Sequence, residues 1–534
     1  MNYGAPKPLR RLRSAFLWPH LSWASKKGGN AAWGWLPAAA LLCTLLGAAL
    51  RLLHAIQFQA APEADEAVVG LMARHILTGQ AWPAFYYGQA YLGALEAYLV
   101  AALGASPLGL KLVPALFSVA LIGLAWAWTR DAFGREAACI AAILVAFSPA
   151  YAFDFSLRAR GGFVEAIALL LLVLLLARRV ARGASDRTVG CLGLVCGLTV
   201  WTYQTFAVHL LVLAALQWRA QGLPGGRRAL WWASGFLLGT APMLVYNVLH
   251  PLATLWEIGV KYAGVTGGMY KTHGAVGAVL QGALKRAADV AAFPKQMALL
   301  YTSESDPAVE TVDLSPLSLV VLGIHAAAVA AAVWMRGREG DRPSGRTLTL
   351  WMLAATVITG FFRARYLMPC VIFFAALAGR GLAGRRTPLL AAALAVILFY
   401  NARQIWTDFG TDESAPYRDL VAALRANDLR YGYTGYDIAY PVAFLSEETI
   451  ILSPKAGPIS FDRLPHYTDK VRTQARICYI FEDGSEIDAR FRALLSDLGV
   501  ICERLRAGRF AIYHGLPPDA VRAIPLPVGA VAER

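Results

Sequence analysis

The feature that most constrains this sequence is a series of apolar runs separated by short segments rich in Arg, Lys, Gly and Pro. A bilayer core about 30 Å thick is crossed by a helix of roughly 20 apolar residues, so such runs predict membrane-spanning helices. About eleven candidates are present, several of them shorter than about 17 residues. They lie at residues 34–57, 107–128, 136–150, 162–177, 189–202, 205–218, 229–248, 314–335, 347–362, 366–379 and 387–402. We therefore expect a polytopic α-helical membrane protein.

The composition agrees with a chain that has lipid as its main solvent. Apolar residues make up 57% of the sequence and charged residues only 16%, whereas soluble domains have about 25% charged residues. The excess of 50 Lys and Arg over 35 Asp and Glu does not indicate nucleic-acid binding, because the basic residues form short clusters between apolar runs. The seven Cys show no CxxC or Cys/His spacing, which argues against a structural zinc site. Membrane lipids, and no nucleic acid, are the expected partners.

The positions of the basic clusters predict the orientation in the membrane. Loops rich in Lys and Arg remain on the cytoplasmic side. The basic N-terminus and the loops near residues 130–135, 178–187, 219–228, 336–346 and 380–386 fall on one side. We expect a bacterial inner-membrane protein with a cytoplasmic N-terminus at 1–33, a transmembrane domain at 34–403 and a periplasmic domain at 404–534. The expected periplasmic segments before this domain are a first loop at 58–106 with interfacial helices, a second loop at 151–161, a long loop at 249–313 and a short turn at 362–365.

After residue 403 the composition changes to that of a small soluble domain. Helical patterning appears at 416–428 and 487–499, and strand-like runs appear at 448–453, 475–481 and 509–515. These patterns predict an α/β domain. Cys478 and Cys502 both lie in it, and a disulfide between them or two buried thiols are equally compatible with the sequence.

The first outward loop opens with two adjacent carboxylates, Asp65 and Glu66. Apolar residues over 68–77 have the spacing of an amphipathic helix in the membrane interface. Acidic residues favour helix N-termini through capping and the macrodipole, so the pair has a structural explanation as well as a chemical one.

The order of several short motifs provides further information. Arg51 near the outer end of the first run is followed by ADEA at 64–67, a short helix ending at Gly79, the segment YYGQAYLGALEAYL at 86–99 and, much later, RYLMP at 365–369. This order resembles the ArnT-like family 39 glycosyltransferases, which include protein mannosyltransferases, lipid A aminoarabinose transferases and rhizobial lipopolysaccharide sugar transferases. The resemblance covers roughly residues 35–400. It implies a GT-C fold and inverting transfer of a sugar from a polyprenyl-phosphate donor to a cell-envelope glycan, lipid or protein on the periplasmic face.

The resemblance also implies roles for individual residues. Asp65 matches the carboxylate of the family's first acidic motif, so we expect it to be the general base, with Glu66 beside it. Asp154, in the second outward loop, corresponds to an acidic residue that orients the acceptor or a cation in many GT-C enzymes. These carboxylates could share a divalent ion, which the resemblance does not require; no other cofactor is expected.

Two arginine clusters on the outward side could stabilise the negative charge of a leaving phosphate. One contains Arg158 and Arg160, and the other contains Arg363, Arg365 and Tyr366. Arginines that anchor to lipid headgroups are the plain alternative for each. Their position on the side opposite to the basic loops favours a functional role.

The sequence departs from the aminoarabinose transferases at one motif. Where those proteins carry a Lys-Pro pair whose lysine meets the donor phosphate, this chain has Tyr87 and Gln89, which can form hydrogen bonds but bring no charge. Glu96 follows on the same helical face and could hold a sugar hydroxyl or pair with an arginine.

Two other classes of protein remain as alternatives. A transporter or flippase of lipid-linked glycans would be expected to carry ionisable residues at the membrane midplane, whereas the charged candidates here gather at one face. A scaffold that binds a partner through the C-terminal domain leaves the outward carboxylates and arginines unexplained. The identities of the sugar and the acceptor depend on pocket shape, which short motifs do not encode.

Overall fold

The computed structural model describes residues 34–221, 225–257, 293–302, 315–334, 343–359, 364–384, 387–409, 415–457, 461–526 and 528. The chain divides into two compact units. We call the first, which comprises Met1–Arg51, Leu116–Leu157 and Phe163–Phe409, the helical unit. The second, the mixed unit, comprises Leu52–Ala115, Arg158–Gly162 and Gly410–Arg534. The N-terminal segment 1–33, most of the expected loop at 249–313 and Arg363 lie outside the described residues.

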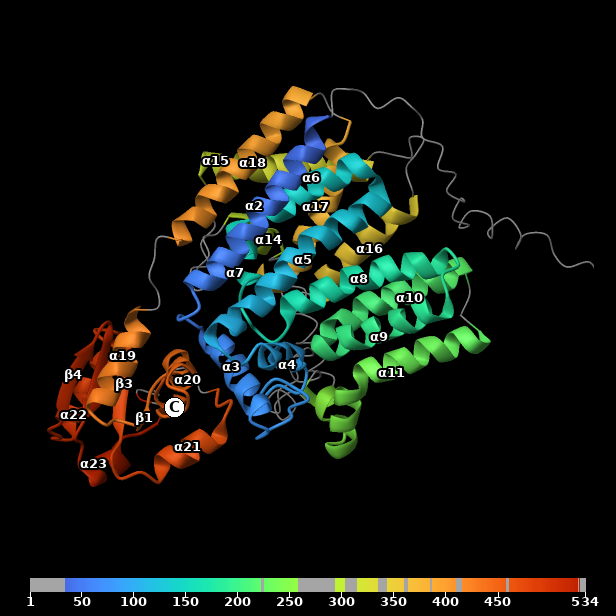
Figure 1. Cartoon of the computed structure of the whole chain (residues 1–534). Helices are drawn as coiled ribbons and strands as arrows, with labels where there is room; N and C mark the ends of the chain where they lie inside the picture. The colour runs from blue at the N-terminus through green and yellow to red at the C-terminus, as the bar shows by residue number, and fades with distance from the viewer. Residues whose placement is uncertain are drawn as a thin grey trace, which may run out of the picture. The chain divides into compact units, whose positions relative to one another are not determined.

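Each apolar run found in the sequence coincides with a helix, although the ends differ by several residues (Figure 1). The helices that match the runs are α2 (Trp35–Gln57), α5 (Pro107–Phe133), α6 (Arg135–Ala146), α8 (Phe163–Ala181), α9 (Asp186–Thr202), α10 (Ala207–Gln221), α11 (Gly226–Leu249), α15 (Pro316–Trp334), α16 (Pro343–Thr359), α17 (Met368–Leu382) and α18 (Thr387–Asp408). Shorter elements are α7 (Ala150–Phe155), η2 (Gln204–Phe206), α14 (Phe293–Thr302) and η3 (Ala364–Leu367).

Six of the described segments are long and apolar enough to cross a membrane. They are α2, α5, α11, α15, the segment Arg365–Leu382 that contains α17, and the part of α18 from Pro388 to Thr407. The prediction of a polytopic helical membrane protein is thereby confirmed, whereas the number of about eleven spans stays a prediction.

Arg51, one of the residues on which the family resemblance rests, lies buried inside the helical unit with 2% of its surface exposed. Its guanidinium donates to Ser118 Oγ at 2.8 Å and to the carbonyl oxygens of Gly47, Ala146 and Val145 at 2.9, 2.7 and 3.0 Å. Because α6 ends at Ala146, the guanidinium satisfies carbonyl groups that have no partner within that helix. Arg51 therefore links α2 to the C-terminal end of α6 through hydrogen bonds.

Helices α9 and α11 approach each other through glycines. A Cβ added at Gly197 would lie 2.4 Å from the carbonyl oxygen of Phe236, and one added at Gly235 would lie 2.1 Å from that of Gly190. Such contacts are impossible for any residue with a side chain, so glycine permits the backbones to touch. Close packing on small residues is the usual way in which helices associate in lipid, where the hydrophobic effect does not drive association.

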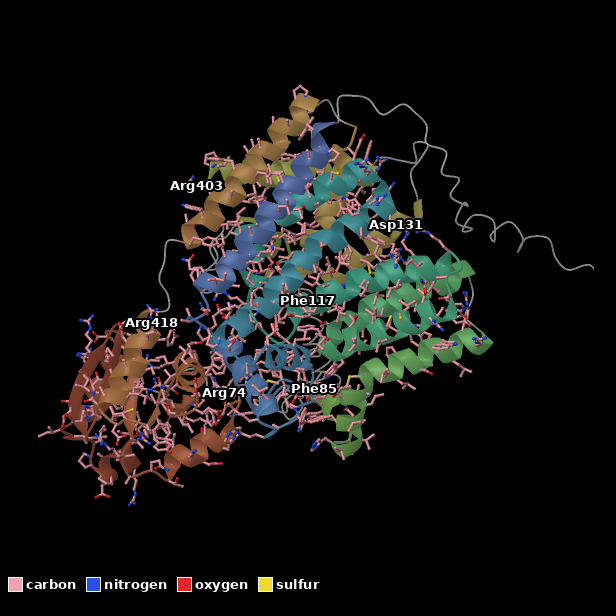
Figure 2. All side chains as sticks on the ribbon, viewed as in Figure 1. Arg74, Phe85, Phe117, Asp131, Arg403 and Arg418 are labelled. Atoms are coloured by element: carbon pink, nitrogen blue, oxygen red, sulfur yellow. The ribbon has the colours of Figure 1, made fainter. Side chains whose placement is uncertain are left out.

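Acidic and basic side chains meet at the C-terminal end of α5. Asp131, labelled in Figure 2, forms ion pairs with Arg178 in the last turn of α8 and with Arg182 just after it. Arg178 is 2% exposed and also donates to the carbonyl oxygen of Asp131. These contacts fix the ends of two long helices relative to each other.

The mixed unit combines α3 (Ala64–Leu77) and α4 (Leu95–Ala102) with the loop at 158–162 and an α/β domain. The domain has a five-stranded sheet of order β2-β1-β3-β5-β4, in which β1 pairs in parallel with β2 and β3, and β5 pairs antiparallel with β3 and β4. The strands are β1 (Tyr431–Tyr433), β2 (Ile451–Ser453), β3 (Cys478–Glu482), β4 (Glu503–Ala507) and β5 (Phe510–His514). Its helices are α19 (Ala415–Ala426), α20 (Tyr436–Leu445), α21 (Pro465–Arg472), α22 (Glu486–Asp497) and α23 (Pro518–Ala523), with η4 (Pro454–Ala456) between β2 and α21.

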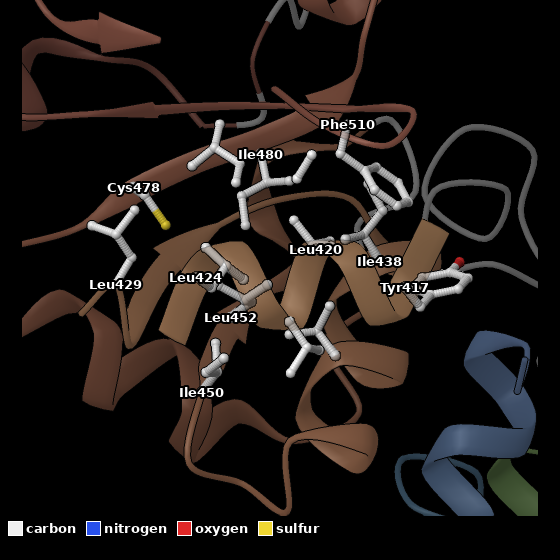
Figure 3. Packing of buried hydrophobic residues seen from close by; sticks show 14 of the residues in the cluster. Tyr417, Leu420, Leu424, Leu429, Ile438, Ile450, Leu452, Cys478, Ile480 and Phe510 are labelled. Carbon is white, nitrogen blue, oxygen red and sulfur yellow. The ribbon is translucent and has the colours of Figure 1, made fainter. Parts of the chain in front are cut away.

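Aliphatic side chains from α19, α20 and the sheet form the core of this domain (Figure 3). Leu420, Leu424 and Phe510 are fully buried there. The apolar residues of α19 recur at helical spacing, which explains why the sequence predicted this helix correctly. Cys478 also lies in the core, whereas Cys502 is half-buried, and both are free thiols; the disulfide is therefore absent, but only one of the two thiols is buried.

Candidate functional site

The local sequence explains why α3 begins where it does and how its two acidic residues differ. Glu63 is the N-cap, and the Glu66 side chain accepts a hydrogen bond from the Glu63 backbone N–H at 3.0 Å, which completes a capping box. The Glu66 side chain therefore points back toward the N-terminus of α3. Asp65, one position earlier, is half-buried and faces a different set of partners.

Asp65 is held by two tyrosine hydroxyls. Tyr436 donates to Asp65 Oδ1 at 2.6 Å, and the Tyr86 hydroxyl is shared between the same oxygen at 3.3 Å and the Asp65 carbonyl oxygen at 3.2 Å. Burial, followed by the nearby charge of Asp65, raises the pKa of both tyrosines, so each stays neutral and acts as a donor. Among the residues that the structure describes, no donor reaches Asp65 Oδ2.

Arg463 lies behind these tyrosines. Its Nε donates to Tyr436 Oη at 3.3 Å, and its guanidinium lies 5.4 Å from the ring centre of Tyr86 and 5.2 Å from that of Phe461. With the Gln89 amide turned so that its oxygen faces the guanidinium, that oxygen accepts from Arg463 at 2.6 and 2.9 Å. A cation is thus fixed within an aromatic enclosure next to the Asp65 carboxylate.

Arg158 and Arg160 both pair with Glu63. Arg158 Nη1 lies 2.7 Å from Glu63 Oε1, and Arg160 Nε donates to Glu63 Oε2 at 2.9 Å. Burial alone raises the pKa of Glu63, but the two arginines outweigh it and hold the value at about 2. The three groups together carry one net positive charge at the N-terminus of α3.

Glu96 fixes the loop that carries these arginines. Its Oε2 accepts from the backbone N–H groups of Gly161 and Gly162 at 2.7 Å each. Both glycines have positive φ, +82° and +86°, which other residues adopt only with strain. A Cβ at Gly161 would also lie 2.3 Å from Leu92. Glu96, one of the predicted site residues, is 1% exposed. Its contacts therefore support the loop that carries the two arginines.

Glu66 has a similar supporting position. Lys111 Nζ lies 2.6 Å from Glu66 Oε2, and both side chains are almost fully buried, with 1% and 0% of their surface exposed. The other carboxylate oxygen accepts from the backbone N–H of Ala159 at 3.2 Å. Glu66 thus connects α3, α5 and the loop at 158–162, which carries Arg158 and Arg160.

Tyr87 belongs to a further hydrogen-bonded group. His75 Nε2 lies 3.1 Å from Glu448 Oε1, and His75 Nδ1 lies 2.9 Å from Tyr87 Oη. Tyr467 donates to the same Glu448 oxygen at 2.6 Å. Since a carboxylate only accepts, His75 Nε2 donates to Glu448. Burial, followed by the charge of Glu448, raises the pKa of Tyr87 to about 12.

Three of the predicted site residues belong to the helical unit instead. Asp154 lies in α7 and is 4% exposed. The guanidinium of Arg365 lies 5.4 Å from the ring centre of Tyr366. Tyr366 lines a small pocket together with aromatic and polar side chains that include Phe163, Tyr203 and His209. No group of three or more His, Cys, Asp and Glu side chains that could hold a metal occurs among the described residues.

The mixed unit therefore brings together seven predicted residues from three separate segments: Asp65, Glu66, Tyr87, Gln89, Glu96, Arg158 and Arg160. Sequence reasoning missed Glu63, Tyr86, Tyr436 and Arg463. Glu63 carried a signal, because it lies two residues before Asp65 at a helix start. Tyr436 and Arg463 carried none, since tyrosines in a small domain usually belong to its core.

Comparisons with known proteins agree with this fold. A scan against protein-family models and a search of curated proteins found no match. Among solved structures, ArnT from Cupriavidus metallidurans bound to undecaprenyl phosphate is similar over 91% of this chain and 98% of that chain, with 12% identity and a TM-score of 0.54. The apo form of that protein gives a TM-score of 0.52 at 14% identity, over the same 91% and 98%.

An oligosaccharyltransferase from Archaeoglobus fulgidus is also similar, over 86% of this chain and 70% of that chain, with 12% identity and a TM-score of 0.49. The likeness to ArnT confirms the resemblance seen in the sequence. The chain has an ArnT-like GT-C fold.

Proposed function

We propose that this protein is an inner-membrane glycosyltransferase that moves a monosaccharide from a polyprenyl-phosphate donor to a cell-envelope glycan, lipid or protein. The observation that carries the proposal is the Asp65 carboxylate, which has one oxygen held by Tyr436 and Tyr86 and the other available. This carboxylate stands at the position that the family resemblance assigns to the catalytic base, on a chain with the GT-C fold. The ArnT structure with undecaprenyl phosphate provides a precedent for the class of carrier.

The reaction follows from what a carboxylate can do at this place. The oxygen of an acceptor hydroxyl forms a bond to the anomeric carbon of the sugar, while the bond from that carbon to the phosphate oxygen breaks. Asp65 Oδ2 takes the hydroxyl proton, and the electron pair leaves with polyprenyl phosphate. Attack from the side opposite to the leaving group inverts the anomeric centre. A general base in this role contributes about 10² to 10⁴ in rate.

The leaving phosphate needs fixed positive charge. We assign this role to Arg158 and Arg160, because both guanidinium groups lie at the start of α3, the helix that carries Asp65, and Glu96 holds their loop in place. Arg365 is a third candidate, beside the Tyr366 pocket. Glu66 and Glu96 then act on the site through the loop that they support, and Asp154 orients the acceptor or a cation.

The orientation belongs to the same proposal. The distribution of the basic loops supports a cytoplasmic N-terminus and a periplasmic α/β domain from residue 404. Sugar transfer would then take place on the periplasmic face, where Asp65 and the α/β domain lie together in the mixed unit.

The proposal is tested by mass spectrometry of lipid-linked sugars and envelope glycans from cells with the intact gene, without it, and with Asp65→Asn. We expect one polyprenyl-phosphate sugar to accumulate, and one envelope glycan to lose that sugar, in both defective strains. In membranes, Asp65→Asn should lower the transfer rate by about 10² or more. If deletion changes the glycans while Asp65→Asn behaves as the parent, transport of a lipid-linked glycan replaces transfer as the explanation.

A further inference from the structure

The two oxygens of the Asp65 carboxylate have different surroundings. Oδ1 accepts hydrogen bonds from Tyr436 at 2.6 Å and from Tyr86 at 3.3 Å. Oδ2 accepts none from the residues that the structure describes. Rotation about the terminal bond of an aspartate costs little, so the carboxylate keeps one orientation only when its surroundings hold it. Tyr436 forms the shorter of the two bonds and is therefore the principal restraint.

The Tyr436 hydroxyl is itself oriented. Arg463 Nε donates to its oxygen at 3.3 Å, so the hydroxyl proton is directed to Asp65. Donation from a cation to the phenol oxygen also strengthens the bond that the phenol donates, as in other hydrogen-bond chains.

Arg463 is held in turn at two points. Its backbone N–H donates to Tyr440 Oη at 2.6 Å, and its guanidinium donates to the Gln89 oxygen. Its charge is enclosed by Tyr86, Tyr436 and Phe461. The chain of contacts from Arg463 through Tyr436 to Asp65 thus runs from the α/β domain to the start of α3.

We propose that Tyr436, oriented by Arg463, is a positioning residue that holds Asp65 Oδ1 so that Oδ2 faces the acceptor hydroxyl. This inference rests on the proposed function. It gives the α/β domain a direct part in the reaction, because the domain supplies Tyr436 and Arg463, which position the general base. Residues more than 350 positions apart in the sequence then form one site.

Removal of the phenol hydroxyl should release the carboxylate to rotate while leaving the surface that binds the donor intact. Small misplacements of a catalytic group cost up to about 10²-fold in rate, because fewer encounters have the reacting atoms aligned. For Tyr436→Phe we expect kcat to fall by about 10-fold or more, with KM for the donor within about 2-fold of the parent value.

The experiment uses the full-length protein in liposomes, with the polyprenyl-phosphate sugar that accumulates in the deletion strain, purified from that strain, as donor. Steady-state kcat and KM are measured for the parent, Asp65→Asn, Tyr436→Phe and the double variant. Because both residues act through one carboxylate, the double variant should be no slower than Asp65→Asn alone. A defect in folding would lower the residual rate of the double variant further.

Tyr479→Phe is the matched control. Tyr479 is buried in the same domain, and its hydroxyl forms no hydrogen bond with any residue that the structure describes. It should therefore keep the parent kcat. Tyr86→Phe, which removes the longer bond, should reduce kcat less than Tyr436→Phe and offers a second test if Tyr436→Phe does not fold.

The outcomes separate this inference from the proposed function. If Asp65→Asn is slow but Tyr436→Phe retains the parent kcat, or changes only KM, the positioning role is wrong and the base assignment stands. If the double variant is much slower than Asp65→Asn, the Tyr436 substitution acts through folding or by another route than the Asp65 carboxylate, and the inference is again overturned. If Asp65→Asn itself is as fast as the parent, the proposed function fails first.

Discussion

Among single residues of the mixed unit, Glu66 and Lys111 stand out because both are charged and both are almost fully buried. Their ion pair of 2.6 Å lies beneath the start of α3. Burial of two charges is costly, and their attraction compensates for it only while both are present. Removal of one partner leaves the other charge buried without compensation.

Lys111→Met should therefore lower the free energy of unfolding by about 3 to 5 kcal/mol, the usual cost of breaking a buried pair. The measurement is chemical denaturation of the purified protein in detergent. The double variant Glu66→Gln with Lys111→Met removes both charges and should recover part of the loss. A Lys111→Met variant as stable as the parent would mean that Glu66 does not depend on this cation.

At the scale of elements, the contact between α9 and α11 depends on glycines rather than on apolar side chains. A Cβ at Gly197 would lie 2.4 Å from the backbone oxygen of Phe236, so the two helices would have to separate. Gly323 in α15 offers a matched comparison, because nothing lies within 4 Å of a Cβ built there.

Gly197→Ala should destabilise the protein by about 1 to 3 kcal/mol, as forced insertion of a methyl group into a packed contact does. Gly323→Ala should be neutral or stabilising by up to about 1 kcal/mol, because alanine favours the helix. Thermal unfolding midpoints in one detergent compare the two variants. Equal behaviour of the two would show that α9 and α11 do not pack through this face.

The elements that the sequence predicted correctly are those in which local pattern and environment agree. Long apolar runs form helices because a helix satisfies its backbone hydrogen bonds within its own segment in lipid. Two strands were missed: β1 has only three residues, with a glycine at its centre, and β4 reads ERLRA and has little apolar alternation. Their pairing with β3 and β5 comes from tertiary context, which overrides weak local preference.

Across the whole molecule, the candidate site is assembled from segments far apart in the sequence. The order of short motifs led to Asp65, and the position of two arginine clusters on the side opposite to the basic loops led to Arg158 and Arg160. Tyr436 and Arg463 could not be found in this way. Their relation to Asp65 exists only once the α/β domain packs against α3, and the sequence contains no local trace of that contact.

Two carboxylates link these distant segments, and they should make stability depend on pH. Glu63 faces Arg158, Arg160 and Lys111, and its pKa falls from the usual 4.5 to about 2. Burial alone raises the pKa of Glu448, but hydrogen bonds from His75 and Tyr467 outweigh it and lower the value. A carboxylate with a lowered pKa in the folded state stabilises the protein above its unfolded pKa and loses this contribution as pH falls.

The free energy of unfolding should therefore decrease as pH falls from about 4.5 toward 2, the window set by Glu63. Glu63→Gln should be less stable than the parent at neutral pH, and the difference should shrink in this window as the parent carboxylate becomes protonated. Thermal midpoints of the full-length protein at constant ionic strength measure both. Glu486→Gln, which removes an exposed pair with Arg490 on α22, is the control and should follow the parent at every pH. A difference between Glu63→Gln and the parent that stays constant down to about pH 3 would contradict the assignment, because the lost stability would then not come from the charge of Glu63.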